Sequence, residues 1–283
     1  MKKVLAILLA LAMVFSFAAC GEKKEEPKQE DPKQEKPAPV KFIMGIDPEY
    51  DPFSYLGPDG NYTGFDVEVC RAACELLGYE MEIFGVNWDE KLIQLDAKEC
   101  DCVWSGMTIR QSMKDAGYVI SNPYFNNDQI IVVKENSGIK SSADLAGKIV
   151  GVQLGTSGEA MLTDPEEEGN RVELAKTFKN LVTANSFATC FADLDGNAVD
   201  AVVVDMPVAQ SYVADHPGFV ILDEVLGSEL YGIAFRKGEE ALCEAIEGAV
   251  ADLVKNGTYQ KIADKYDTID QRNLTYVNKL LTK

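Results

Sequence analysis

Two aspartates stand at the carboxyl ends of predicted β-strands, where a side-chain carboxylate could face a ligand. Asp47 follows the strand predicted for Lys41–Ile46, and Asp205 ends the apolar run VDAVVVD. Ligands of open α/β sheets bind in the crevice outside the carboxyl ends of the strands. The two carboxylates could accept hydrogen bonds from a cationic group or, when protonated, act as general acids. Asp205 could equally cap a helix, because a Met-Pro pair follows it.

Hydrogen-bond donors gather in two further segments that are predicted to leave strands. The candidates are Ser105, Gly106 and Thr108 in the first segment, and Thr156 and Ser157 in the second. Their backbone N–H groups and hydroxyls could hold an anion, in the second segment at the N-terminus of a helix. Turn formation and helix capping explain the same residue types without any ligand.

The common motifs of nucleophilic, nucleotide-dependent and zinc catalysis are absent from the sequence. The segment GVQLGTSG has glycines after a predicted strand but lacks the Lys of a phosphate-binding loop. Among six cysteines after Cys20, Cys70 and Cys74 are one helical turn apart, and Cys100 and Cys102 share a strand face. Because the chain has a single His to support a metal site, we expect reduced core thiols, with disulfides as the alternative. We expect no metal and no cofactor.

An α/β fold in two lobes must position these residues, because short β runs alternate with amphipathic helical stretches. The spacing predicts a helix over 64–78, a second helix opened by a capping box of Asn87 and Glu90, and a strand over 101–104. After residues 129–134 the same alternation starts again. The ligand is expected in the cleft between the lobes.

The first 39 residues are predicted to be a targeting signal followed by a tether. Two Lys and then sixteen apolar or small residues precede Cys20, which is short for a spanning helix and typical of a signal peptide. Residues 1–20 resemble a bacterial lipoprotein signal in which Cys20 carries the lipid; an ordinary secretory signal is the alternative. Residues 21–39 hold four Pro and no aromatic residue, which predicts a disordered tether. The net charge of -19 argues against nucleic acid as a partner.

Eight separated motifs, taken in order, make the chain resemble the polar amino-acid solute-binding proteins of ABC importers (bacterial extracellular solute-binding protein family 3). They are GIDPEYDPFSY (45–55), GNYTGFDVEV (60–69), CDCVWSGMTI (100–109), NPYFNNDQIIVV (122–133), LAGKIVGVQLGTSGE (145–159), DAVVVDMPVA (200–209), YGIAFRKG (231–238) and NGTYQKIADKY (256–266). Each motif alone is weak evidence, whereas their shared order and spacing are strong evidence.

The resemblance implies a periplasmic-binding-protein-like fold (type II) whose two lobes close on a small zwitterion about two crossing strands. Lobe 1 would take residues 40–132 and 227–283, and lobe 2 would take residues 133–226. The crossings are expected near Gln129–Lys134 and Glu229–Phe235. The protein would be a monomeric extracytoplasmic receptor without enzyme activity, bound to the membrane only by its lipid, that delivers an amino acid to an ABC permease.

The resemblance also implies roles for the candidate residues. Asp205 matches the family's ammonium-binding Asp, Asp47 matches a second cleft acid, and the donor residues match positions around the ligand carboxylate. Aromatic residues would form the wall around the ligand side chain, although aromatic residues at such positions are more often core. The aromatic candidates are Tyr50, Phe53, Trp104 and Trp88.

One position departs from the family pattern. The family's carboxylate-clamping Arg stands five residues after the Thr that matches Thr108, and that position is Met113 in this chain. We expect Arg110 to take over the carboxylate contact; otherwise the ligand lacks an α-carboxylate or is held by backbone donors. Cleft acids without that Arg favour neutral or cationic ligands over Asp or Glu. The rival function is a cyclohexadienyl-dehydratase-like enzyme on the same fold, with a cleft acid as general acid.

Overall fold

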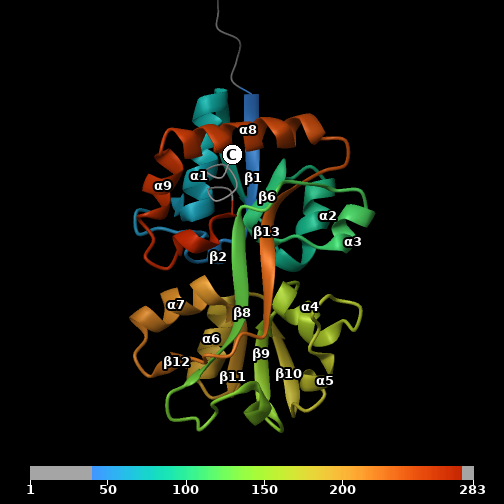
Figure 1. The fold of residues 1–283 in the computed structure, drawn as a ribbon, viewed down its shortest axis with the longest axis vertical. Helices are drawn as coiled ribbons and strands as arrows, with labels where there is room; N and C mark the ends of the chain where they lie inside the picture. The colour runs from blue at the N-terminus through green and yellow to red at the C-terminus, as the bar shows by residue number, and fades with distance from the viewer. Residues whose placement is uncertain (1–39, 276–283) are drawn as a thin grey trace, which may run out of the picture. The chain divides into compact units, whose positions relative to one another are not determined.

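Two α/β lobes joined by two long strands make up the part of the chain that the computed structural model describes, residues 40–275 (Figure 1). The joining strands are β8 (Phe125–Lys134) and β13 (Gly227–Phe235). The predicted two-lobed α/β fold with two hinge strands is therefore confirmed. The signal predicted for residues 1–20, the lipidation site Cys20 and the tether predicted for 21–39 lie outside the described residues.

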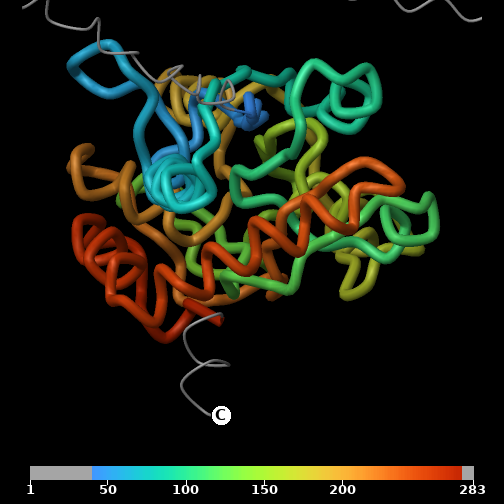
Figure 2. The backbone as a smooth tube through the Cα atoms, turned by 90° about the horizontal axis from the view of Figure 1, so that it is seen from above, coloured from blue at the N-terminus to red at the C-terminus, as the bar shows by residue number. Residues whose placement is uncertain are grey.

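Lobe 1 is a twisted sheet covered on both faces. The sheet runs in the order β5 (Tyr79–Gly85), β1 (Val40–Ile46), β6 (Cys102–Thr108) and the second half of β13, with β7 (Val119–Ile120) also on β13. One face packs against α1 (Phe65–Leu77), α8 (Glu240–Lys255) and α9 (Thr258–Ala263). Figure 2 shows α8 running beside α1 across this lobe. The other face packs against α2 (Lys91–Asp96) and α3 (Gln111–Asp115).

Helix α1 forms where the spacing predicts it. Phe65, Val69 and Ala73 are buried along one stripe of the helix, whereas Arg71 on the opposite side is exposed. The helix ends at Gly78, which adopts the left-handed conformation with φ 70° that a side chain disfavours. The apolar stripe and the terminating glycine are both local signals.

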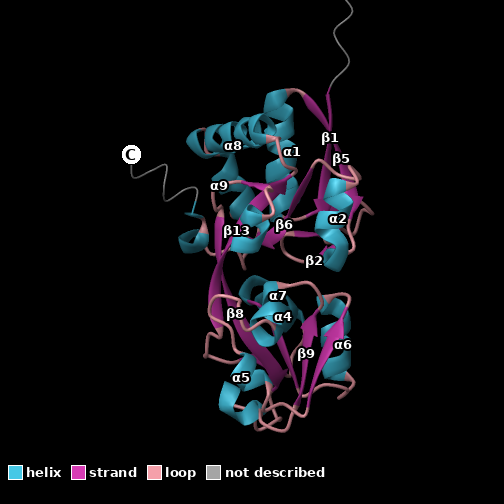
Figure 3. Cartoon of the chain, turned by 90° about the vertical axis from the view of Figure 1, so that its right-hand side faces the viewer, coloured by secondary structure: helices cyan, strands magenta, loops and turns pink. Residues whose placement is uncertain are grey.

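Lobe 2 repeats the layered arrangement (Figure 3). Its sheet runs in the order β10 (Asn180–Ala184), β9 (Ile149–Gln153), β11 (Ala201–Asp205) and β8, with β12 (Phe219–Ile221) also on β8. One face packs against α6 (Phe187–Asp195) and α7 (Met206–Asp215), and the other against α4 (Ser157–Thr163) and α5 (Val172–Ala175). Every residue of β11 is buried, as its unbroken apolar run predicts.

The two crossing strands pair with each other only between Phe125–Gln129 of β8 and Gly227–Tyr231 of β13. The rest of β8 pairs with β11 in lobe 2, and the rest of β13 pairs with β6 in lobe 1. The crossing in β8 therefore overlaps the predicted Gln129–Lys134 only at Gln129 and otherwise lies before it. Residues 130–132, predicted for lobe 1, pair with β11 in lobe 2.

The predicted capping box of Asn87 and Glu90 is wrong. A 3-10 turn covers Trp88–Glu90, and the Asn87 side chain caps no backbone N–H. The backbone N–H of Asn87 donates instead to Gln94 Oε1 at 2.8 Å, so a residue in the following helix takes the place of the Glu90 carboxylate. This alternative partner is one turn further along the chain than the capping-box pattern considers.

All six cysteines of the described residues are free and buried, the arrangement expected of core thiols. Cys70, Cys74 and Cys102 belong to the main core of lobe 1, between α1 and β6. Within residues 40–275, no group of His, Cys, Asp and Glu side chains is arranged to hold a metal ion. Over the same residues, no helix is long and apolar enough to cross a membrane.

Candidate functional site

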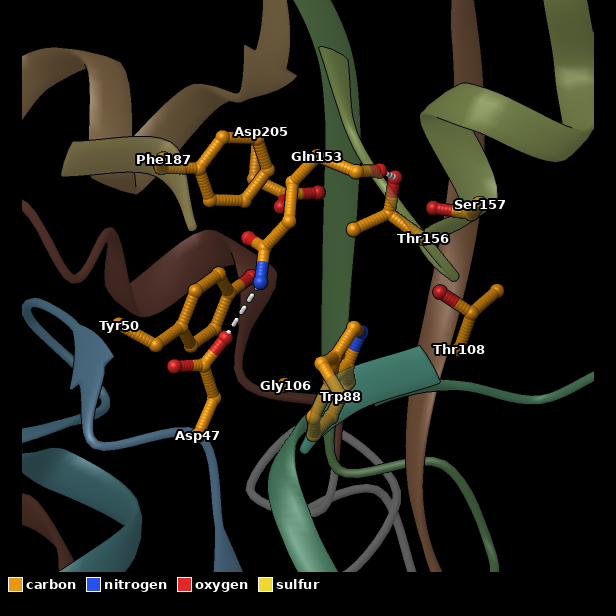
Figure 4. A pocket seen from close by; sticks show the side chains of 10 residues that line it. All are labelled: Asp47, Tyr50, Trp88, Gly106, Thr108, Gln153, Thr156, Ser157, Phe187 and Asp205. Atoms are coloured by element: carbon orange, nitrogen blue, oxygen red, sulfur yellow. Dashed lines mark hydrogen bonds between the residues drawn. The ribbon is translucent and has the colours of Figure 1, made fainter. Parts of the chain in front are cut away.

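Residues of both lobes enclose a small central cavity next to the crossing strands (Figure 4). Its volume is about 10 Å³, enough for a single water molecule. The lobes are therefore closed on one another. The lining residues are Asp47, Tyr50, Trp88, Gly106, Thr108, Gln153, Thr156, Ser157, Phe187 and Asp205.

Three hydrogen bonds across the cleft join the closed lobes. Gln153 Nε2 of lobe 2 donates to Asp47 Oδ2 of lobe 1 at 2.7 Å, the bond drawn in Figure 4. Lys91 Nζ donates to the Gly155 carbonyl and Arg110 Nη2 to the Thr156 carbonyl, both at 2.8 Å. Burial lowers the pKa of Lys91 to about 8, with the nearby Arg110 guanidinium adding to the effect. A ligand larger than water can enter only after these bonds open.

Asp205 faces the cavity and does not cap α7. It stands at the N-cap position, yet its carboxylate accepts no hydrogen bond from that helix. The donors to Asp205 Oδ1 are Asn127 Nδ2 at 2.6 Å and Gln129 Nε2 of the same strand. Burial, together with the neighbouring Glu229 carboxylate, raises the pKa of Asp205 well above its ordinary value. The structure thus removes the helix-cap explanation for this residue.

Glu229 is a third carboxylate, next to the cavity lined by Asp47 and Asp205, and sequence analysis did not identify it as a site residue. It lies in the crossing region of β13, and its Oε1 accepts hydrogen bonds from Asn127 Nδ2 at 2.7 Å and Gln129 Nε2 at 2.9 Å. Asp205 and Glu229 therefore share both amide donors. The alternation of side chains along β13 could have indicated Glu229, because residues two apart point to the same side of a strand. Tyr231 is two residues after Glu229, and its hydroxyl lies 2.8 Å from the hydroxyl of the cavity residue Tyr50.

The aromatic candidates divide between cavity and core. Tyr50 and Trp88 line the cavity, with their ring centroids 6.5 Å apart. Phe53 and Trp104 do not line it, because both are packed inside the core of lobe 1. Phe187 at the start of α6 completes the aromatic wall, 6.1 Å from the Tyr50 ring, and was missed because a buried aromatic on an amphipathic helix reads as core.

The expected strand-exit loop at Ser105, Gly106 and Thr108 is wrong, because β6 continues through Thr108. The Ser105 hydroxyl lies 2.5 Å from the Ser54 hydroxyl, and the Gly106 N–H donates to Asp66 Oδ2 at 2.8 Å. Both groups are thus bonded within lobe 1 and do not face the cleft as free donors. Thr108 does line the cavity, and its hydroxyl donates to Glu229 Oε2 at 2.9 Å.

Gly106 serves the site through its missing side chain. A bulge in β6 places residues 104–106 opposite the single residue Ile233 of β13, and Gly106 has φ 53°. A Cβ at this position would lie 2.4 Å from Cε1 of Tyr50. The glycine therefore allows the Tyr50 ring to pack directly on the backbone of β6.

From lobe 2, Thr156 and Ser157 reach the cavity at the start of α4. Thr156 is the N-cap residue, and its Oγ1 accepts from the Glu159 N–H at 3.2 Å. The Ser157 hydroxyl accepts from Gln129 Nε2 at 3.1 Å. Arg110 lines a neighbouring cavity of about 120 Å³ and not the central one. Met113 is buried in the lobe 1 core and supplies no clamp.

Comparison with known proteins gives one consistent result. The family model of bacterial extracellular solute-binding proteins, family 3, matches residues 42–268. The arginine-binding extracellular protein ArtP of Bacillus subtilis (strain 168) is 33% identical over 271 residues, which cover 95% of this chain and 99% of ArtP.

Solved structures agree with the sequence comparison. An ancestral arginine-binding protein bound to arginine is 35% identical, with a TM-score of 0.72 over 80% of this chain and 98% of that one. The ancestral amino acid-binding protein AncCDT-1, a precursor of cyclohexadienyl dehydratase, is 32% identical, with a TM-score of 0.70 over 80% of this chain and 95% of that one.

Proposed function

The chain belongs to the bacterial extracellular solute-binding proteins, family 3, and on that premise we propose a receptor for neutral or cationic amino acids. It captures an amino acid between its two lobes by hinge closure and delivers it to the permease of an ABC importer. We include in the proposal that it acts as a monomer outside the cytoplasm, anchored by a lipid on Cys20, and that it catalyses no reaction.

The charge of the cavity wall is the observation that supports neutral or cationic ligands. Asp47 and Asp205 line the central cavity, and its lining contains no Lys or Arg among the described residues. The nearest bases, Lys91 and Arg110, donate to backbone carbonyls of lobe 2. An acidic ligand side chain would add a like charge in a water-poor cleft, where repulsion is strong. Neutral and cationic side chains avoid this cost.

We propose a binding partner for each part of the amino acid. The ammonium group binds Asp205, and the side chain lies among Tyr50, Trp88 and Phe187 with its end toward Asp47. The carboxylate binds the hydroxyls that line the cavity from both lobes. Arg110 joins the carboxylate by exchanging its bond with the Thr156 carbonyl for one to the ligand. The opening of the lobes supplies the space that the closed cavity lacks.

A thermal-shift screen of the protein against the common amino acids, cystine and polyamines tests the proposal. A ligand at 100 times its Kd should stabilise the folded protein by about 2.7 kcal/mol, which gives a clear shift in Tm. Shifts with neutral and cationic amino acids, and none with Asp or Glu, support the ligand choice. Stabilisation by glutamate alone would contradict it, and a flat response across the panel would contradict amino-acid capture.

The rival dehydratase-like enzyme has one observation in its favour, the raised pKa of Asp205. A raised pKa lets a carboxyl group hold its proton to higher pH, which suits it to act as a general acid. Water elimination from a cyclohexadienyl carboxylate, followed by absorbance of the aromatic product, would establish this activity. Loss of that turnover in Asp205→Asn would identify the acid.

A further inference from the structure

The neighbouring cavity of about 120 Å³ that Arg110 lines is here called the basic cavity. Lys91 of α2 is its second base, and its lining contains no Asp or Glu among the described residues. Three residues of the lining carry hydroxyl groups, namely Thr108, Ser112 and Ser157. Two cations and three hydroxyls around one cavity are the donor groups that bind a carboxylate. The basic cavity therefore has the chemistry of an anion site.

The basic cavity adjoins the central cavity at the place where the proposed function puts the ligand carboxylate. Thr108 of lobe 1 and Ser157 of lobe 2 line both cavities. Figure 4 shows these two side chains together at one end of the central site. A carboxylate that binds these hydroxyls therefore lies at the boundary between the two cavities, with the bases of the basic cavity on its far side.

Lys91 keeps one hydrogen-bond donor for such an anion. Its Nζ donates to the Gly155 carbonyl of lobe 2 at 2.8 Å and to the Trp88 carbonyl at 2.9 Å. A protonated amine has three N–H donors, so these two bonds leave one donor. Lys91 can therefore bind an anion without giving up its bond to lobe 2.

The positive charge of Lys91 has no counter-charge in contact with it. Among the described residues Lys91 forms no ion pair, whereas Arg110 lies 3.9 Å from Glu167. The carboxylates that act on Lys91 from a greater distance are Asp89, Asp47 and Glu159. They do not offset burial and the neighbouring Arg110 guanidinium, which lower the pKa of Lys91 to about 8. A ligand carboxylate would supply the negative charge that the closed cleft lacks beside Lys91.

We propose that Lys91 is a second base for the ligand carboxylate, which it binds together with Arg110 from the basic cavity. The inference rests on the proposed function, because the carboxylate belongs to the captured amino acid. The bond from Lys91 to Gly155 joins the two lobes, so it requires closure and holds the amine at the boundary of the central cavity. The carboxylate in turn reduces the repulsion between the two bases. A ligand without a carboxylate gains no affinity from Lys91.

Calorimetric titration of the full-length protein with two pairs of ligands tests the inference. The pairs are L-arginine with L-argininamide and L-methionine with L-methioninamide. Each amide keeps the ammonium group and the side chain but has no carboxylate, and at pH 6 the ammonium group of all four ligands is protonated.

The test variant is Lys91→Met, which keeps a side chain of similar length beside the Trp88 ring, whose centroid lies 4.7 Å from Lys91 Nζ. Lys91→Arg restores the positive charge. The matched control is Lys261→Met, which removes an exposed base of the same lobe outside the basic cavity.

Lys91→Met should weaken binding of the better-bound amino acid by about 10-fold or more and binding of its amide by less than twofold. Lys91→Arg should recover most of the loss, and the control should change neither ligand. Equal weakening of the amino acid and its amide would overturn the inference, because it indicates a bond that only holds the lobes together or a separate inorganic anion. Unchanged binding of the amino acid would also overturn it and leave the proposed function standing. Binding of neither amino acid by the wild-type protein overturns the inference too, and a flat thermal-shift screen overturns the proposed function with it.

Discussion

Replacing Asp205 by Asn should lower ligand affinity and raise the stability of the ligand-free protein. The side chain is 4% exposed, so a bound ammonium would meet its carboxylate in a poorly solvated site. Two unit charges 4 Å apart interact by about 4 kcal/mol at an effective dielectric constant of 20. A neutral hydrogen bond to Asn recovers about 1 kcal/mol. The net loss is therefore about 3 kcal/mol, or roughly 150-fold in Kd.

The stability change has the opposite sign. Burial and the neighbouring Glu229 carboxylate raise the pKa of Asp205 in the folded protein. Between its ordinary pKa and this raised value, the folded state keeps a proton that the unfolded state releases, so stability falls as pH rises through that window. Asn carries no such cost. The Tm gain of Asp205→Asn should therefore be larger at pH 8 than at pH 5.

Calorimetric titration with the strongest ligand of the screen and thermal melts at both pH values measure the two effects. Asp215→Asn is the matched control, because it removes an exposed carboxylate from the far end of α7. We expect no change in either quantity for the control. Unchanged affinity in Asp205→Asn would refute the ammonium role. Reduced affinity with a lower Tm at both pH values would indicate that Asp205 acts as a structural residue.

Three further results are expected. Burial raises the pKa of Asp66 to about 7, so the free energy of unfolding in urea should fall from pH 5 to pH 8. Asp66→Asn should reduce this pH dependence. A free energy of unfolding that rises with pH in the wild-type protein would contradict the prediction. Gly106→Ala places a Cβ 2.4 Å from the Tyr50 ring at φ 53° and should cost roughly 1–3 kcal/mol in thermal melts, with weaker ligand binding; full stability would disprove that close packing. Gln153→Ala removes the bond to Asp47 and should increase the radius of gyration of the ligand-free protein in solution scattering, whereas an unchanged radius would show that this bond does not hold the closed state.

The elements that sequence analysis located well are those whose signals are local. Helix α1 is fixed by a buried stripe and a terminating glycine within its own residues. Strand β11 is recognisable because it is buried on both faces. Asp205 was identified as a site residue for a related reason, since it is the last residue of this strand. Short-range patterns were sufficient for elements whose own residues specify the helix or strand. In these elements the neighbouring segments only cover the buried side.

The errors concern residues whose environment comes from distant parts of the chain. β6 extends to Thr108 because Tyr231 and Gly232 of β13 pair with its last residues, more than 120 positions later. Glu229 became part of the site only because the crossing strands bring it beside two amide side chains of β8. The carboxylate contact of Arg110 stays a prediction. The spacing of residues within one strand does not show which distant strand will pair with it.

The residues that hinge this protein and the residues that surround its site overlap. Asn127 and Gln129 on β8, and Glu229 on β13, lie where the two strands cross. In a fluorescent biosensor built from this chain, substitutions that retune selectivity at these positions would also shift the resting angle between the lobes, and with it the baseline signal. Directed evolution toward a new analyte would therefore gain independent control only from positions such as Trp88 and Phe187, which line the site but lie off the crossing strands.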